Sequence, residues 1–161
     1  MAFRPANRTN PLARRMNWST VRLNLAGGEP LLHADKLPAI VSQARALGFE
    51  VSLISNGSHL DHGLLDRLAP QLSWLGISID SACPATNRAI GRVDRRDRLL
   101  DLATGLANAR QTNPGLRLKL NTVVNRLNHG ENLGPLIRRF APDKWKVLRM
   151  LPVVSHAELP P

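Results

Sequence analysis

The stretch Gly27–Pro30 (Gly-Gly-Glu-Pro) places two small residues, a carboxylate and a proline directly after a leucine-rich run. Adjacent glycines allow the backbone to turn sharply and to approach a ligand closely. A carboxylate beside such a turn can bind an ammonium group through a charge-assisted hydrogen bond, and proline restricts the direction in which the chain leaves. No Gly-Lys-Ser/Thr follows, which excludes a Walker phosphate loop. The stretch therefore predicts either an ordinary tight loop after a strand or a site for a zwitterionic ligand.

The remaining reactive side chains exclude several kinds of chemistry. The histidines share no metal-ligand spacing beyond His59 and His62, a pair at a loop-to-helix junction that is more typical of a surface. Cys83, the only cysteine, and Ser81 have no histidine partner that would indicate nucleophilic catalysis. One cysteine cannot form an internal disulfide, so we expect a reducing, cytoplasmic setting. No apolar run approaches the roughly 20 residues of a membrane span, so we expect no membrane partner.

The elements that must position these residues follow from the apolar pattern. Helical leucine stripes occupy positions 37–47, 60–68, 99–109 and 133–140. They separate five strand-like runs: Thr20–Leu25, Glu50–Ser55, Trp74–Asp80, Leu116–Val123 and Lys144–Met150. A strand and a helix repeated four times, then a final strand, predict an α/β fold with parallel strands and crossover helices.

The faces of the strands predict how the sheet is covered. Apolar and polar residues alternate in three of the runs, at 20–25, 74–80 and 116–123. A doubly wound sheet would have apolar residues on both faces of its strands. We therefore expect helices on the apolar face only, and a polar face that lines the inside of a whole or partial barrel. An α+β sheet with one wet face is the alternative.

The motifs in this order resemble a known family. The Gly-Gly-Glu-Pro stretch, "VSLISNGS" at 51–58 and "LGISIDS" at 75–81 resemble radical S-adenosylmethionine (SAM) enzymes. The segments "ISIDS…NRAIGR" (77–92), "LKLNTVVNRLN" (118–128) and "DKWKVLRML" (143–151) resemble viperin-like nucleotide dehydratases, and the resemblance covers about 22–154. It implies a partial (βα)6 barrel in which a [4Fe–4S] cluster cleaves SAM. The resulting radical would convert a nucleoside triphosphate to its 3′-deoxy-3′,4′-didehydro form in antiviral defence.

The resemblance also implies residue roles. SAM would be held by Gly27, Gly28, Glu29 and Pro30 at its amino group, by Arg92 at its carboxylate, and by Ser55, Asn56 and Ser78 at other polar groups. The nucleoside triphosphate would meet Arg22, Lys119, Asn121, Lys144 and Lys146. Lys119 and Asn121 lie two residues apart, as do Lys144 and Lys146, so each pair shares one strand face. No catalytic residue is assigned.

The cluster-binding part of the family is missing from these 161 residues. Such a cluster needs three cysteine thiolates, and this chain has only Cys83. We therefore expect a barrel that lacks its first strand, its cluster loop and its C-terminal part, is inactive alone, and associates with a complementary fragment. The expected organisation is a basic, disordered arm over 1–17, an incomplete barrel over 18–155 and a tail over 156–161.

Charge leaves a second hypothesis open. The net charge is +10, and five arginines but no acidic residue precede Glu29. Such a balance favours anionic partners. The alternative function is thus a non-enzymatic, degenerate barrel that binds nucleotide or nucleic acid through its basic residues.

Overall fold

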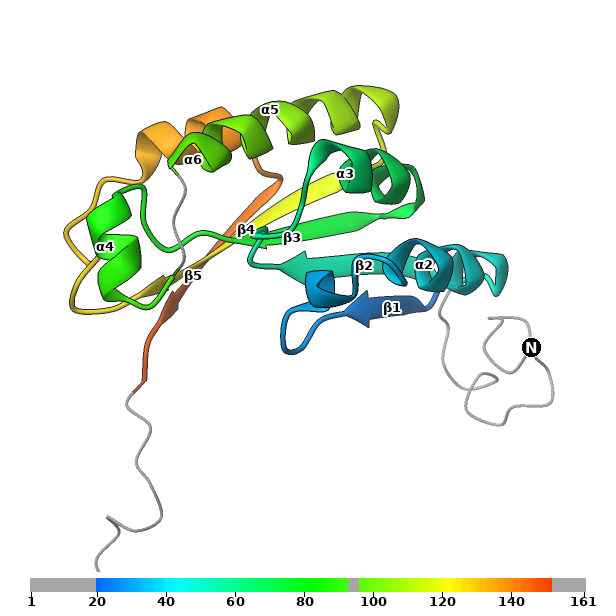
Figure 1. Ribbon diagram of the computed structural model, residues 1–161, viewed down its shortest axis with the longest axis horizontal. Helices are drawn as coiled ribbons and strands as arrows, with labels where there is room; N and C mark the ends of the chain where they lie inside the picture. The colour runs from blue at the N-terminus through cyan, green and yellow to red at the C-terminus, as the bar shows by residue number, and fades with distance from the viewer. Residues whose placement is uncertain (1–19, 93–95, 152–161) are drawn as a thin grey trace, which may run out of the picture.

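A computed structural model describes residues 20–92 and 96–151, and side chains from 99 onward in the second range. The predicted arm over 1–17 and tail over 156–161 lie outside the described residues. The described chain forms one five-stranded sheet with helices packed on it (Figure 1). None of the helices described in these ranges is long and apolar enough to cross a membrane.

The sheet is entirely parallel, and its strands follow one another in chain order. They are β1 (Arg22–Leu25), β2 (Glu50–Ser55), β3 (Trp74–Ser78), β4 (Arg117–Val124) and β5 (Lys144–Arg149). All the carboxyl ends therefore meet at one edge, as the arrowheads in Figure 1 show. The predicted parallel α/β fold is confirmed: the bounds of β2 match the prediction, and the other strands differ from it by at most two residues at either end.

Helices connect the strands as the leucine stripes predict. They are η1 (Pro30–His33), α2 (Leu37–Ala46), α3 (His62–Leu68), η2 (Ala69–Gln71), α4 (Pro84–Ala89), α5 (Arg96–Thr112) and α6 (Gly134–Phe140). Asp61 caps α3, because its Oδ1 accepts a hydrogen bond from the Leu64 amide at 2.7 Å. The short helix α4 had no apolar stripe to predict it, and it begins at a proline, whose fixed φ suits a first helical turn.

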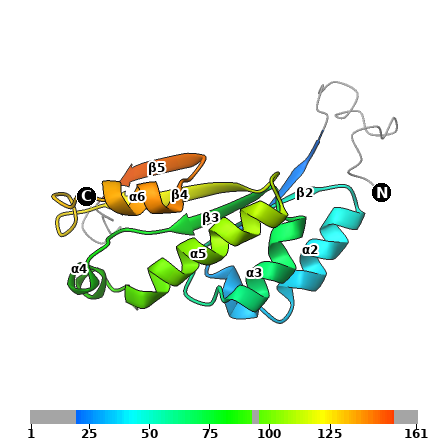
Figure 2. The same ribbon diagram turned by 90° about the horizontal axis from the view of Figure 1, so that it is seen from above.

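One face of the sheet carries the core. Leu53, Leu75, Ile77, Leu118 and Leu120 are fully buried there, beneath helices that lie on a single side of the sheet (Figure 2). The alternate residues of the same strands lie on the opposite face, where most are polar or small but Ile54 and Trp74 are apolar. No described helix covers that face, which agrees with the prediction of helices on the apolar side only.

The two edge strands differ in exposure. β1 pairs only with β2, and β5 only with β4, among the described strands. Every residue of β5 is exposed, including Trp145 and Val147. Trp145 is nevertheless fixed to the sheet, since its Nε1 donates to Thr122 Oγ1 at 3.0 Å.

Candidate functional site

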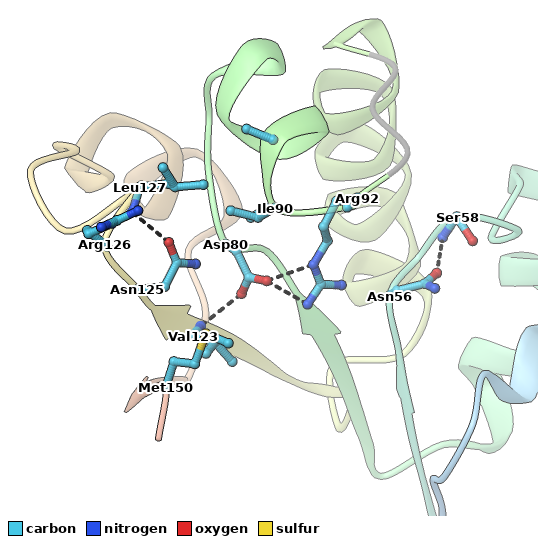
Figure 3. A pocket seen from close by; sticks show the side chains of 12 residues that line it. Asn56, Ser58, Asp80, Ile90, Arg92, Val123, Asn125, Arg126, Leu127 and Met150 are labelled. Atoms are coloured by element: carbon cyan, nitrogen blue, oxygen red, sulfur yellow. Dashed lines mark hydrogen bonds and ion pairs between the residues drawn. The ribbon is translucent and has the colours of Figure 1, made fainter. Parts of the chain in front are cut away.

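A cleft of about 810 Å³ lies at the carboxyl ends of the strands, where parallel sheets bind ligands. Its walls come from the ends of β2, β3 and β4 and from the turn after α4 (Figure 3). The lining residues are Asn56, Ser58, Asp80, Ala89, Ile90, Gly91, Arg92, Val123, Asn125, Arg126, Leu127 and Met150. The cleft thus combines apolar walls with a few charged and amide groups, as small-molecule sites do.

An ion pair lies at the centre of the cleft. Asp80 Oδ2 accepts from Arg92 Nε at 2.7 Å and lies 2.6 Å from Arg92 Nη2. Its other oxygen, Oδ1, accepts from the Val123 amide at 2.8 Å. Asp80 is buried, whereas a third of the Arg92 side chain is exposed, so the guanidinium is the part of the pair that a ligand can reach.

Two further tethers hold the loops around this ion pair. The Asn128 side-chain amide donates to the carbonyls of Asp80 and Val123, at 2.8 and 2.9 Å. Glu131 accepts from the Ser81 hydroxyl at 2.6 Å and from the Ala82 amide at 3.1 Å. The ends of β3 and β4 are therefore joined by side chains from the loop after β4.

The Gly-Gly-Glu-Pro stretch forms the loop between β1 and η1. Gly27 and Gly28 have φ values of 102° and 52°, which side chains disfavour, so the glycines are required by the turn itself. The Glu29 carboxylate accepts three hydrogen bonds: from Ser55 Oγ at 2.6 Å, from the Asn56 amide at 2.8 Å and from the Leu31 amide at 3.0 Å. It therefore ties this loop to the end of β2.

The other residues expected around SAM lie at the same edge of the sheet. Asn56 lines the cleft, and its Oδ1 accepts from the Ser58 amide at 2.7 Å. The Ser55 hydroxyl donates a hydrogen bond to Glu29 and accepts one from the Gly57 amide. Ser78 ends β3 on the polar face, directly opposite Asn121. The structure thus brings Asn56 and Arg92 into the cleft, whereas Ser55 and the loop Gly27–Pro30 lie at the same edge of the sheet but do not line the cleft.

The residues expected around the nucleotide gather on the polar face. Lys119 lies opposite Lys144, and Asn121 lies opposite Lys146. Neighbouring strands are about 4.8 Å apart, so these side chains emerge side by side. We call Lys119, Lys144 and Lys146 the lysine cluster. In the described part of the chain, none of the three forms a salt bridge with a carboxylate.

A second hollow, of about 370 Å³, lies over this face. It is lined by Arg22, Asn24, Ser52, Leu53, Ile54, Trp74, Gly76, Lys119 and Lys144. Arg22 is already paired with Glu50 at 2.9 Å, and Arg117 lies over the Trp74 ring, 5.6 Å from its centroid. The free positive charge of the hollow therefore belongs to the two lysines.

The electrostatics of the lysine cluster favour a bound anion. Burial lowers the pKa of Lys119, and the charges of Lys146 and Lys144 lower it further. Like charges directly opposite each other destabilise a sheet. An anion between these lysines would remove that repulsion and raise the pKa of Lys119 again.

The described residues do not bring together a set of metal ligands. No group of three or more His, Cys, Asp or Glu side chains in the described residues could hold a metal ion. Cys83 is exposed at the start of α4. The residues of this chain therefore do not fit an iron–sulfur cluster.

Sequence reasoning missed several residues of the site. Asp80 had a signal, since it continues the polar alternation of Gly76 and Ser78, but its pairing with the partly exposed Arg92 could not be read from spacing. Asn128 and Glu131 carried no signal, because they act through backbone groups and hydroxyls from distant loops.

Comparison with known proteins supports the family resemblance. A profile of the Radical SAM superfamily matches residues 8–129. S-adenosylmethionine-dependent nucleotide dehydratases from Pseudoalteromonas ulvae and Psychrobacter lutiphocae are 41% and 37% identical over 152 and 145 residues. These matches cover 91% and 89% of this chain but 48% and 49% of the relatives, so the chain spans about half their length.

Solved structures agree on the fold. Coproporphyrinogen III oxidase from Escherichia coli, described as a radical SAM enzyme, matches with a TM-score of 0.64 at 15% identity. The match covers 87% of this chain and 36% of that one. The described sheet therefore corresponds to part of a radical SAM barrel.

Proposed function

We propose that this chain, which belongs to the radical SAM superfamily, forms the part of a nucleotide dehydratase that binds S-adenosylmethionine and a nucleoside triphosphate. The lysine cluster carries this proposal, because its charges are unmatched by carboxylates in the described residues and lie on the face that leads to the cleft. The relatives, named as SAM-dependent nucleotide dehydratases, support the pairing of these two ligands.

S-adenosylmethionine suits the cleft in size and chemistry. Pockets for ligands of this size span roughly 300–1,000 Å³. The exposed part of Arg92 offers a guanidinium to the carboxylate, and the loop Gly27–Pro30 offers backbone carbonyls to the ammonium group. Asn56, Ser55 and Ser78 are further polar groups at the same edge. In this superfamily, bound SAM supplies the group that removes a hydrogen atom from the substrate.

The nucleoside triphosphate suits the polar face. Lys119, Lys144 and Lys146 would neutralise the phosphates, Asn121 would donate a hydrogen bond, and Arg22 would border the far end of the hollow. From Lys119 to Val123, β4 advances about 13 Å, at roughly 3.3 Å per residue. The phosphates would thus lie deep on the sheet while the rest of the nucleotide reaches toward the cleft.

The [4Fe–4S] cluster that the superfamily uses does not fit these residues, and we derive no step through it. One thiolate cannot replace three. We propose that the missing thiolates come from polypeptide outside the 161 residues, and that this chain alone performs no radical chemistry. We also propose a cytoplasmic location, because an unpaired cysteine is typical of a reducing compartment.

Calorimetric titration with nucleoside triphosphates tests the proposal. We expect Lys146→Ala to weaken binding by about 10- to 100-fold, because a hydrogen bond to a charged group is worth about 1.5–3 kcal/mol. Arg138→Ala, which removes one exposed positive charge on α6, is the matched control and should change binding less than about threefold. S-adenosylhomocysteine affinity should stay unchanged in both variants.

Two results would contradict the proposal. A parent chain that binds no nucleoside triphosphate would remove the nucleotide site. Equal weakening by Lys146→Ala and Arg138→Ala would favour the non-enzymatic alternative, in which nucleotide or nucleic acid is attracted by the overall positive charge.

A further inference from the structure

Asp80 is the only charged residue that is buried among the described residues, with 5% of its surface exposed. Both of its carboxylate oxygens are occupied by the chain itself. Oδ2 contacts Nε and Nη2 of Arg92, and Oδ1 accepts a hydrogen bond from the Val123 amide (Figure 3). Because both oxygens are engaged by the chain and the residue is buried, a ligand in the cleft meets Arg92 rather than Asp80.

Arg92 is held from one side only. Nε and Nη2 contact Asp80, whereas no described residue accepts a hydrogen bond from Nη1. The side chain follows Gly91, whose φ of 78° turns the chain at the rim of the cleft. One edge of the guanidinium is thus fixed, and the other remains available at the position where a carboxylate of a ligand would meet it.

We propose that Asp80 is a positioning residue that orients Arg92 for the carboxylate of S-adenosylmethionine, an inference that rests on the proposed function. A free arginine loses rotamer freedom when a ligand orders it, and a guanidinium that is already ordered avoids part of that cost. The bond from Val123 to Asp80 extends this order to β4, which forms the opposite wall of the cleft.

Two ligands separate this role from a merely structural one. S-adenosylhomocysteine carries the amino acid portion of SAM, whereas 5′-methylthioadenosine carries the adenosine and thioether without it. We expect the full chain to bind the first more tightly than the second by about 10- to 100-fold, because only the first can engage Arg92. Arg92→Ala should remove this preference.

Asp80→Asn keeps an acceptor for the Val123 amide but removes the charge that anchors Arg92. We expect it to reduce the preference for S-adenosylhomocysteine by about tenfold while 5′-methylthioadenosine binds as in the parent. Adding Asp80→Asn to Arg92→Ala should have no further effect on the preference, because the two residues act as one unit.

Asp143→Asn is the matched control. Asp143 also accepts from a β4 amide, that of Leu118 at 2.7 Å, and pairs with an arginine, Arg110, at 3.1 Å. It lies at the opposite end of the strand from the cleft. The Asp143→Asn substitution should lower the stability of the fold as Asp80→Asn does, and should leave the ligand preference unchanged.

A measurement on the parent chain covers the case in which Asp80→Asn does not fold. The Arg92 Nε–H signal in an NMR spectrum should be protected from solvent exchange and should shift with S-adenosylhomocysteine but not with 5′-methylthioadenosine. An unprotected Arg92 signal in the parent would overturn the inference. So would an Asp80→Asn variant that weakens the binding of both ligands equally, or one that binds S-adenosylhomocysteine more tightly than the parent does. A parent that binds neither ligand would instead overturn the proposed function.

Discussion

The carboxylate of Glu29 lies where the hydrogen bonds of two loops converge. It satisfies the amides of Leu31 and Asn56 and orients the hydroxyl of Ser55, which in turn accepts from Gly57. A ligand ammonium group can approach this carboxylate only beside these donors. The primary effect of Glu29 is therefore to fix the shape of the loop whose backbone we propose for SAM.

Replacing Glu29 with glutamine should destabilise the free protein. The amide –NH2 cannot accept, so at least one of the three donors loses its partner, which costs about 1–3 kcal/mol. Urea unfolding measures this loss. Glu50→Gln is the control, since the Arg22–Glu50 pair is partly exposed and should contribute less than about 1 kcal/mol. An unfolding free energy like the parent's in Glu29→Gln would mean that the carboxylate is free to serve a ligand.

At the scale of elements, α3 and α5 are joined by a titratable contact. His62 Nε2 lies 2.9 Å from Asp101 Oδ1, and the hydrogen bond and charge of Asp101 raise the pKa of His62. Gly105 of α5 packs on the same ring, where an added Cβ would lie 3.0 Å from His62 Cε1. A side chain at position 105 would therefore press on the His62 ring and displace it.

This contact predicts a pH-dependent melting temperature. A raised pKa in the folded state means that the stabilisation is complete below the unfolded value of about 6.5 and is lost as the pH rises through the folded value. The melting temperature of the parent should therefore fall over that range relative to His62→Gln and Asp101→Asn, which cannot make the charged contact. Parallel melting curves for all three proteins against pH would refute the assignment.

At the scale of the whole molecule, β5 is an edge strand that pairs only with β4 among the described strands and exposes apolar side chains. Val147 and Leu148 are 53% and 38% exposed, and Met150 and Leu151 continue the exposed apolar run. Exposed edges of this kind recruit other strands. The net charge of +10 on each chain opposes such contact but does not block the edge of the sheet itself.

We expect the chain to self-associate in sedimentation velocity experiments, and Val147→Lys to shift it toward monomer, because an edge lysine opposes strand pairing. Leu47→Lys provides the matched control: Leu47 is also 53% exposed but follows the helix α2 and belongs to no strand. A monomeric parent would show that β5 does not mediate self-association. Equal effects of the two variants would indicate general hydrophobic association instead.

The sequence by itself determined the layers of this protein. Strand residues alternate between faces with a period of two, so Leu118 and Leu120 had to face the helices while Lys119 and Asn121 faced away. The motif Gly27–Pro30 likewise predicted a turn after a strand. Only the tertiary structure decided which charges neutralise one another. Asp80 and Arg92 are joined across the helix α4, whereas the lysine cluster is left without carboxylates in the described residues, because the parallel register places lysine opposite lysine.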